Sequence, residues 1–312
     1  MLPLLYGEDR IVRQVLEDPQ TAEISELHKL AWRWTRRFVR ESWTFGLEHV
    51  RELRDQGIDD AELLRWVEGA AVQTWWVMSA DAGGVSLDEF TPTSGRAVGL
   101  EREDYEAQQF RTAAASAAAL EALPAPAPNG VAWVEIDLDR LEYREAAASA
   151  VGRYGFVPNF LKAFSLRPPM YRRHLRAFEL LEAPTTPRLT PRLHALARAL
   201  TTLFNRSAYG QVTSRAQLER VTGDPELWQR LSEDEHETGW SDDERAVLDF
   251  AARMAQGSYR VTDKDAARFI DVGLDAAAYV EVANVVSIQT ANDRTANALG
   301  LVPDPEPILS QR

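Results

Sequence analysis

Apolar residues recur every three or four positions through most of the chain, and this spacing predicts amphipathic helices. Thr190 is the expected N-cap of one of them, and a proline follows it at the first helical position. Capping boxes at Ser241–Glu244 and Thr262–Asp265 predict the start of two more. Asp275 caps a last long helix, which is expected to reach about Thr295. The pattern therefore predicts an all-α fold.

One segment departs from this pattern, since residues 131–137 alternate between apolar and polar side chains in the way that is typical of a strand. Before it, the Ala-rich stretch 104–123 predicts a helix. Residues 124–130, Pro-Ala-Pro-Ala-Pro-Asn-Gly, cannot continue that helix and favour a stiff, extended linker. We therefore expect one domain over residues 1–123, the linker 124–130, and a second domain over residues 131–312.

An internal repeat relates the two parts. Residues 57–74 align without a gap with residues 273–290. Each copy has a glycine, an N-cap aspartate two residues later, a mostly apolar helix and a Gln-Thr pair. Any two helical hairpins share some of these features by chance, but the length of the gap-free match favours duplication. We expect two related helical domains packed together.

Composition and charge narrow the chemistry. The 312 residues include no cysteine, which excludes disulfides, thiolate nucleophiles, iron–sulfur clusters and thiolate zinc sites. The net charge of −13 opposes binding to nucleic acids and to anionic membranes. The first residues lack the basic and apolar regions of a signal peptide, and the histidines lack regular metal-ligand spacing. We expect a cytoplasmic protein that binds a small molecule, with no metal, cofactor, nucleic-acid partner or membrane association.

Six short motifs follow one another in the second part of the chain: Tyr154–Asn159, Arg167–Met170, Leu189–Leu193, Asn205–Gly210, Ser241–Arg245 and Asp293–Gly300. In order and spacing they resemble the alkylhydroperoxidase-like, or carboxymuconolactone decarboxylase, family, especially its peroxidase-related branch. Residues 42–57 bear a weaker resemblance to one more unit of this family. The resemblance implies two helical units and assembly as a homodimer or small homo-oligomer.

The resemblance also indicates which chemistry the chain lacks. Peroxidase members carry a C-x-x-C-x-x-x-H motif, in which two thiolates reduce the peroxide while the histidine and an upstream glutamate relay protons. At these positions the chain has Ser207, Gly210, Ser214 and Ala195. A hydroxyl cannot cycle through a sulfenic acid and a disulfide, so dithiol peroxidase chemistry is excluded.

Other polar and aromatic residues supply candidates for a site. His49 is the candidate general base, oriented by the neighbouring Glu48 or by Asp81 from another helix. The alternative for His49 is a buried histidine bonded to a backbone carbonyl. Substrate-binding candidates belong to the Trp-rich first half or occupy and flank the family's site: Trp43, Trp75, Trp76, Ser207, Tyr209, Ser214, Asn292, Asp293 and Arg294.

Several of these candidates also have a purely structural interpretation. Clustered tryptophans line a ligand pocket in some proteins but more often form a core. Two adjacent rings on one helix cannot share a face, so either Trp75 or Trp76 is expected to leave the core. Arg294 is expected to hold a substrate carboxylate, and the alternative is a structural ion pair with Asp293.

Two functions are compatible with the sequence. The first is a cofactor-free, non-redox enzyme that acts by acid–base chemistry on a small lactone or carboxylate-type metabolite. Decarboxylase members of the family imply such chemistry on this scaffold. The second is a catalytically retired member that serves as a binding or assembly protein. Loss of all four relay residues favours retirement, whereas the aromatic residues and the two units favour new chemistry, and we favour the enzyme.

Overall fold

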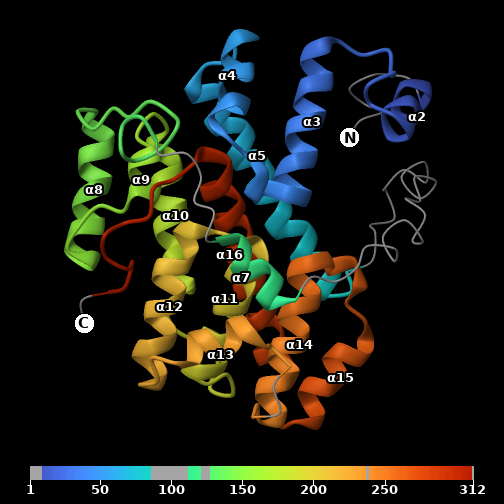
Figure 1. Cartoon of the computed structure of the whole chain (residues 1–312), viewed down its shortest axis with the longest axis vertical. Helices are drawn as coiled ribbons and strands as arrows, with labels where there is room; N and C mark the ends of the chain where they lie inside the picture. The colour runs from blue at the N-terminus through green and yellow to red at the C-terminus, as the bar shows by residue number, and fades with distance from the viewer. Residues whose placement is uncertain (1–8, 86–111, 121–126, 237–238, 311–312) are drawn as a thin grey trace.

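The computed structural model describes residues 9–85, 112–120, 127–236 and 239–310, and in this part of the chain all the regular structure is helical. The all-α fold is therefore confirmed. Figure 1 shows the first helices at one end of the molecule and the C-terminal ones at the other, with α16 running through the centre. The elements are α2 (Asp9–Glu17), α3 (Glu26–Glu41), the 3-10 helix η1 (Ser42–Thr44), α4 (Leu47–Asp55), α5 (Asp60–Ala82), α7 (Ala113–Leu120), α8 (Leu141–Tyr154), α9 (Asn159–Ala163), α10 (Pro168–Leu180), α11 (Pro191–Asn205), α12 (Ala208–Thr222), α13 (Leu227–Glu233), α14 (Asp242–Gly257), the 3-10 helix η3 (Ser258–Arg260), α15 (Asp263–Asp271) and α16 (Ala276–Leu299).

The predicted helix starts are confirmed in atomic detail. The Thr190 hydroxyl accepts the backbone N–H of Leu193, 3.2 Å away, at the start of α11. At the starts of α14 and α15 the carboxylates of Glu244 and Asp265 accept the N–H groups of the N-cap residues Ser241 and Thr262. The Asp275 carboxylate accepts a backbone N–H of the first turn of α16. Helix α16 ends at Leu299, about one turn beyond the predicted end. Local capping signals thus fix where these helices begin.

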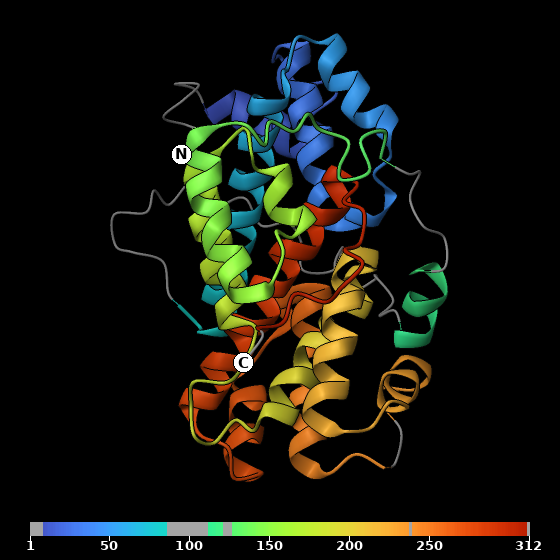
Figure 2. The ribbon, with the colours of Figure 1, turned by 90° about the vertical axis from the view of Figure 1, so that its left-hand side faces the viewer.

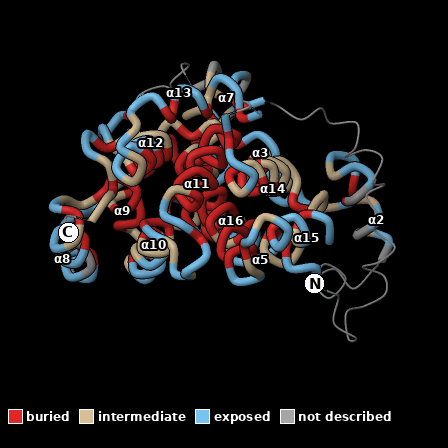
Figure 3. Tube along the Cα trace, turned by 90° about the horizontal axis from the view of Figure 1, so that it is seen from below, coloured by how far each residue is buried: buried red, intermediate tan, exposed pale blue. Residues whose placement is uncertain are grey.

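Helices α11 and α16 form the centre of the bundle. Every residue of α11 from Leu193 to Asn205 is buried, and α11 packs on α12, α14 and α16. Figure 3 shows the traces of α11 and α16 in red at the middle of the molecule, with the more exposed helices around them. A helix that is buried on all sides must bond its polar side chains to its neighbours, because water cannot reach them.

The repeat extends well beyond the residues that aligned in the sequence. Four consecutive elements recur at a constant offset of 216 residues: α3, η1, α4 and α5 correspond to α14, η3, α15 and α16. Gly57 and Gly273 stand before the two long helices with φ of 82° and 85°, a left-handed conformation that favours glycine. The described residues before α3 contain only α2, so the N-terminal repeat has no counterpart there of α11 and α12.

Two reciprocal contacts join the repeats. The Ser258 hydroxyl, in η3, donates to the Asp81 carboxylate at the end of α5, 2.6 Å away. The Asn297 amide, near the end of α16, donates to the Ser42 hydroxyl in η1 at 3.1 Å. At the offset of 216 residues, Ser42 corresponds to Ser258 and Asp81 to Asn297, so each of the two contacts is the counterpart of the other. Two units related by a two-fold axis have such reciprocal contacts. The long helices α5 and α16 pack against each other between these contacts.

The strand expected over residues 131–137 does not form. Among the described residues, two backbone hydrogen bonds tie this segment to another, from Trp133 N to Leu299 O and from Val302 N to Val131 O. Side chains bond several of its other backbone groups: the side-chain oxygen of Asn129 and the carboxylate of Asp60 accept three of its N–H groups in place of a partner strand. The alternation of side chains thus reflects an extended segment between helices.

Both apolar cores contain residues from before and after the expected linker. One joins Met78 and Ala82 to α11, α14 and α16, and the other joins α3 and the first half of α5 to α8, α9 and α10. Of the expected helix 104–123, the described part is α7, and of the linker only residues 127–130 are described. The division into two domains at 124–130 stays a prediction. Among the described residues, no helix combines the length and the apolar character needed to cross a bilayer.

We predict that Asp60 is a main tie between the N-terminal helices and the segment after the linker. This carboxylate is 7% exposed, accepts two hydrogen bonds from Arg54 at 2.8 Å and one from the backbone N–H of Glu135 at 2.6 Å. Asp60→Ala leaves a guanidinium and an amide without their acceptor, and should lower the free energy of unfolding by about 3 kcal/mol in urea titrations. The exposed pair Arg144–Asp139 supplies the control, since Asp139→Ala should change it little. Equal effects of the two substitutions would contradict this role.

Candidate functional site

A buried arginine lies at the middle of α11. The Nε of Arg198 donates to Gln289 Oε1 at 2.9 Å, and Nη1 donates to Gln217 Oε1 at 2.7 Å and to the Leu181 carbonyl at 3.0 Å. The side chains that hold it come from α12 and α16. Burial lowers the pKa of Arg198 to about 10, which still leaves the guanidinium charged at neutral pH.

A buried carboxylate lies on α16 beside this arginine. Asp293 is 1% exposed, and it accepts hydrogen bonds from Gln289 Nε2 at 2.8 Å and from Asn205 Nδ2 at 3.1 Å. Burial raises the pKa of Asp293 to about 6, because the hydrogen bonds to the carboxylate and the charge of Arg198 offset only part of the loss of hydration. A carboxyl group in this state can donate or accept a proton near neutral pH.

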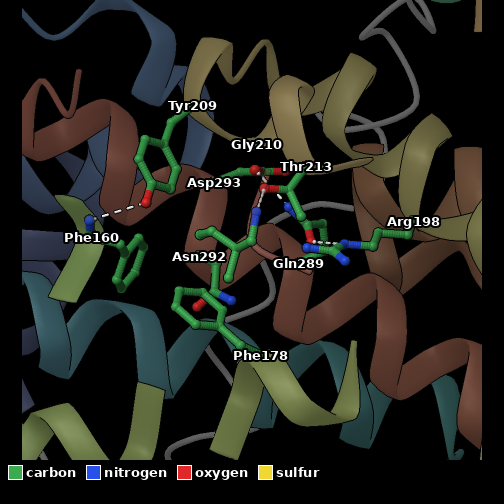
Figure 4. Close-up of a pocket in the computed structure, with 10 residues that line it drawn as sticks. Phe160, Phe178, Arg198, Tyr209, Gly210, Thr213, Gln289, Asn292 and Asp293 are labelled. Carbon is green, nitrogen blue, oxygen red and sulfur yellow. Dashed lines mark hydrogen bonds between the residues drawn. The ribbon is translucent and has the colours of Figure 1, made fainter. Parts of the chain in front are cut away.

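The two charged groups line a small pocket that Figure 4 shows in close-up. The pocket has room for one or two water molecules. Asn292 is 9% exposed, and its Nδ2 has no hydrogen-bond partner although it is buried. The pocket therefore combines an arginine, a free amide donor and a carboxyl group. Its lining consists of Phe160, Phe178, Arg198, Tyr209, Gly210, Thr213, Gln289, Asn292, Asp293 and Ile308.

The C-terminal segment closes one side of this pocket. The Tyr209 hydroxyl donates to the Asp304 carboxylate at 2.5 Å and accepts the backbone N–H of Phe160 at 3.0 Å. The backbone N–H of Ile308 donates to the Thr213 hydroxyl. Figure 2 shows the segment after α16 running down beside α12 towards the C-terminus. These contacts fix two walls of the pocket, one from α12 and one from residues 304–308.

The site occupies the place where the family resemblance puts the dithiol motif. A Cβ added at Gly210, the position of the second thiol, would lie 2.1 Å from Asp293 Oδ1. The carboxylate thus fills the space that a side chain at 210 would need. Ser207, the first thiol position, caps α12 by accepting the Gly210 N–H at 3.0 Å, and Ser214 lies 3.0 Å from the Thr202 hydroxyl. All these positions are buried.

Part of the predicted substrate-binding set is brought together here. Tyr209, Asn292 and Asp293 line the pocket, and the Ser207 hydroxyl is close enough to Asp293 to lower the pKa of its carboxyl group. Arg294 is half-buried on the next position of α16 and is not among the lining residues. The arginine that lines this pocket is Arg198.

The predicted catalytic residues lie elsewhere. His49 stands at the third position of α4, where its Nδ1 accepts the N–H of the N-cap residue Gly46 at 3.0 Å. The Glu48 carboxylate does lie 3.2 Å from this nitrogen, but it is largely exposed. Asp81 bonds to Ser258 and, among the described residues, makes no contact with His49. Asp265, the counterpart of His49 at the offset of 216, caps α15 in the same way. The geometry thus gives His49 a capping role.

The predicted tryptophans do not gather around one pocket. The guanidinium of Arg206 lies 4.8 Å from the centre of the Trp43 ring. Trp75 packs against both apolar cores, while Trp76 is 60% exposed. As expected for adjacent residues on one helix, only one of the two rings faces the core. None of the three lines the pocket described above.

Sequence reasoning missed Arg198, Gln289 and Asn205, although a signal for them was present. On the buried helix α11, Arg198 and Asn205 are seven residues apart and so lie on one face. On α16, Gln289 and Asp293 share a face in the same way. Polar side chains at helical spacing inside a buried helix indicate a polar network, and this rule would have found the site.

Comparison with known proteins supports the helical fold but identifies no particular activity. No protein-family model and no curated protein sequence matches the chain. Among solved structures, the chain is similar to the alkylhydroperoxidase AhpD core of an uncharacterized peroxidase-related protein from Ralstonia eutropha JMP134, with a TM-score of 0.50 and 19% sequence identity. The match covers 56% of this chain and 93% of that one. The resemblance found in the sequence is thus confirmed as an alkylhydroperoxidase-like helical fold.

Protonation of Asp293 is predicted to stabilise the folded chain. Its pKa is about 6 when folded and 3.8 ordinarily. The folded state therefore binds the proton more tightly, and the free energy of unfolding falls as the pH rises from about 4 to about 6. The loss amounts to about 3 kcal/mol at neutral pH. Urea unfolding of wild type and Asp293→Asn between pH 4 and pH 8 measures it as the difference between the two curves.

This difference isolates one carboxyl group. The buried His174 and His194, whose pKa values burial lowers to about 3 and about 4, destabilise the fold as the pH falls, but they do so in both proteins. The difference should change between about pH 4 and pH 6 and be flat on either side. Parallel curves for the two proteins over the whole range would show that Asp293 has an ordinary pKa.

A side chain at position 210 is predicted to disrupt the site. Gly210→Ala forces its Cβ against the Asp293 carboxylate, whose hydrogen bonds to Asn205 and Gln289 leave it no alternative position. We expect a loss of a few kcal/mol, about what overpacking a core costs. Gly152→Ala in α8 is the matched control, because a Cβ there meets nothing within 4 Å. Thermal unfolding compares the two, and a fully stable Gly210→Ala protein would contradict the close approach.

Proposed function

We propose that the chain is a cofactor-free, non-redox enzyme that acts by acid–base chemistry on a small carboxylate-bearing metabolite. The reaction is placed in the pocket between α11, α12 and α16. The observation that carries the proposal is the carboxyl group of Asp293, whose pKa of about 6 lies where proton donation and acceptance are both available. Every group that the chemistry needs belongs to the chain itself.

Asp293 is the proposed proton donor and acceptor. A general acid–base group is most effective when its pKa lies near the working pH, and burial supplies that shift here. Asn205 and Gln289 hold the two carboxylate oxygens, so the group is fixed in position before a substrate enters. In the proposed reaction it takes one proton from the substrate and returns one, and its charge is restored at the end.

Arg198 and Asn292 are the proposed anchors for a carboxylate. The guanidinium supplies the positive charge, and the unpartnered Nδ2 of Asn292 supplies a donor that nothing else in the described residues satisfies. The free pocket has the size of one or two waters, which suits a carboxylate group but not a whole lactone ring. The rest of a larger substrate therefore has to displace Phe160 or Phe178, the apolar residues of the lining.

An observation outside the pocket favours a second function, that of a binding or assembly protein. Trp76 and Val77 are 60% and 45% exposed on α5. Large apolar side chains that gather on a surface are typical of an interface. This function requires nothing of Asp293, so the two proposals differ in what they predict for variants of the pocket.

The test pairs ligand binding with turnover. Small carboxylic acids, β-keto acids and hydroxy acids that arise from lactones should raise the melting temperature of the wild-type protein, while the matching amides should not. Asn292→Leu removes the free donor and should abolish the shift. Turnover of any ligand found in this way, followed by proton NMR in D₂O, should fall at least 100-fold in Asp293→Asn, because the general acid–base group is lost.

His49→Gln is the matched control that distinguishes Asp293 from His49 as the acid–base group. Glutamine at the third position of a helix can still accept the N–H of the capping residue, so the fold is kept. The proposal expects its turnover to equal that of the wild type. Loss of turnover in His49→Gln together with full activity of Asp293→Asn would transfer the chemistry to the N-terminal repeat. Absence of both ligand-induced shift and turnover would favour the binding or assembly function.

A further inference from the structure

The residues after α16 form a strap along one side of the pocket. Residues 301–310, which we call the C-terminal strap, contain no helix or strand and run beside α12 in Figure 2. Pro303, Pro305 and Pro307 alternate with other residues in the strap. Proline fixes its own φ and has no backbone N–H, so the strap is stiff but forms few hydrogen bonds with its neighbours.

One carboxylate of the strap holds two walls of the pocket. Asp304 is 6% exposed, and its Oδ1 accepts the backbone N–H of Asn159, the first residue of α9, at 2.8 Å. Its Oδ2 accepts the hydroxyl of Tyr209 on α12 at 2.5 Å. That hydroxyl in turn accepts the N–H of Phe160 at 3.0 Å, the bond that Figure 4 marks with a dashed line. Asp304 therefore fixes the positions of Tyr209 and Phe160, which both line the pocket.

The end of the strap forms a third wall and is attached weakly. Ile308 is 5% exposed and lines the pocket, and its backbone N–H donates to the Thr213 hydroxyl at 3.0 Å. In the described part of the chain, this is the single hydrogen bond between residues 305–310 and the rest of the protein. Pro305 and Glu306, between the two anchors, are exposed. A segment with so few contacts opens more readily than a packed helix.

Entry into the pocket requires one of its walls to move, because all the residues of its lining are buried. Arg198 and Gln289 belong to α11 and α16, and moving either helix would break the hydrogen bond between them. Helix α9, in contrast, has five residues, and its first residue is held by Asp304. The strap and α9 are therefore the walls that can move at the lowest cost.

We infer that the C-terminal strap is the gate of the pocket and that Asp304 is its latch. When residues 304–308 lift, the Ile308 side chain leaves the pocket, and the carboxylate releases Asn159 and Tyr209 together. Helix α9 is then free to shift, which gives the substrate the space that Phe160 occupies when the gate is closed. This inference rests on the proposed function in taking the pocket as a ligand site, but opening of the gate can be measured without any ligand.

A single thiol in the pocket measures how often the gate opens. The chain has no cysteine, so Asn292→Cys places its only thiol in the lining. Adding Asp304→Ala removes the acceptor of Asn159 and Tyr209. This change should raise the rate at which iodoacetamide alkylates the thiol at least tenfold, because the latch no longer holds the gate. Mass spectrometry of the intact protein follows the reaction.

Ser287→Cys on the same helix is the matched control. Ser287 is 0% exposed and lies where α16 packs on α5, with its hydroxyl 3.1 Å from that of Ser79. The alkylation rate of a thiol there should be the same with and without Asp304→Ala. Equal acceleration at both positions would mean that Asp304 stabilises the whole fold, and an unchanged rate at position 292 would mean that the strap does not close the pocket. Either result overturns the inference.

Locking the strap tests the gate from the opposite direction. Because the Ile308 N–H bonds to the Thr213 side chain, thiols at these two positions should form a disulfide on oxidation. Oxidised Thr213→Cys/Ile308→Cys should exchange the amide hydrogens of Asn159 and Phe160 at least tenfold more slowly than the reduced protein, since the gate can no longer open. Equal exchange rates overturn the inference. This comparison leaves Asp304 in place, so it also decides the question where Asp304→Ala does not fold.

Butyrate and acetoacetate distinguish failure of the gate from failure of the proposed function. Both acids should raise the melting temperature of the reduced double variant and lose this effect after oxidation. An equal shift in the two forms overturns the gate. If neither acid binds the wild type while the alkylation and exchange rates change as expected, the proposed function fails and the gate stands.

Discussion

Helix α11 is buried on every side, and this constraint determines both the centre of the fold and its chemistry. An arginine in such a helix has to find its partners within the protein, because an unpaired buried charge is far too costly to keep. Arg198 finds them on α12 and α16. The same requirement draws Asn205 to Asp293. The polar network thus ties together the three helices that the apolar core packs around it.

The pocket lies where the sequence resemblance places the dithiol motif, and its geometry leaves no room for a side chain at position 210. The family resemblance places a thiol at position 210, and the structure places a carboxylate oxygen where that side chain would begin. The two arrangements exclude each other in space, so a carboxylate at 293 and a side chain at 210 cannot coexist without movement. The fold of the similar Ralstonia protein carries no information about the chemistry of this pocket.

The sequence was informative where a local signal decides the structure. Caps at Thr190, Ser241, Thr262 and Asp275 placed helix starts correctly, because a capping hydrogen bond depends on a few neighbouring residues. It failed for residues 131–137, where period-two alternation does not reveal whether a partner strand exists. The choice of His49 as a catalytic base stays a prediction. The structure shows that its Nδ1 accepts the Gly46 N–H, a contact that needs coordinates to be seen.

The repeat explains why half of the polar site could be inferred and half could not. Asn292 and Asp293 were found because they stand near the end of a helix that carries a family motif, whereas Arg198 belongs to α11, which has no counterpart among the described residues of the N-terminal repeat. That absence has two consequences. On α16, the covering helix supplies the arginine and encloses a carboxyl group away from water. On α5, the corresponding face has an exposed tryptophan instead, so two helices at matching places in the repeat differ: one encloses a buried polar site and the other has an exposed apolar side chain.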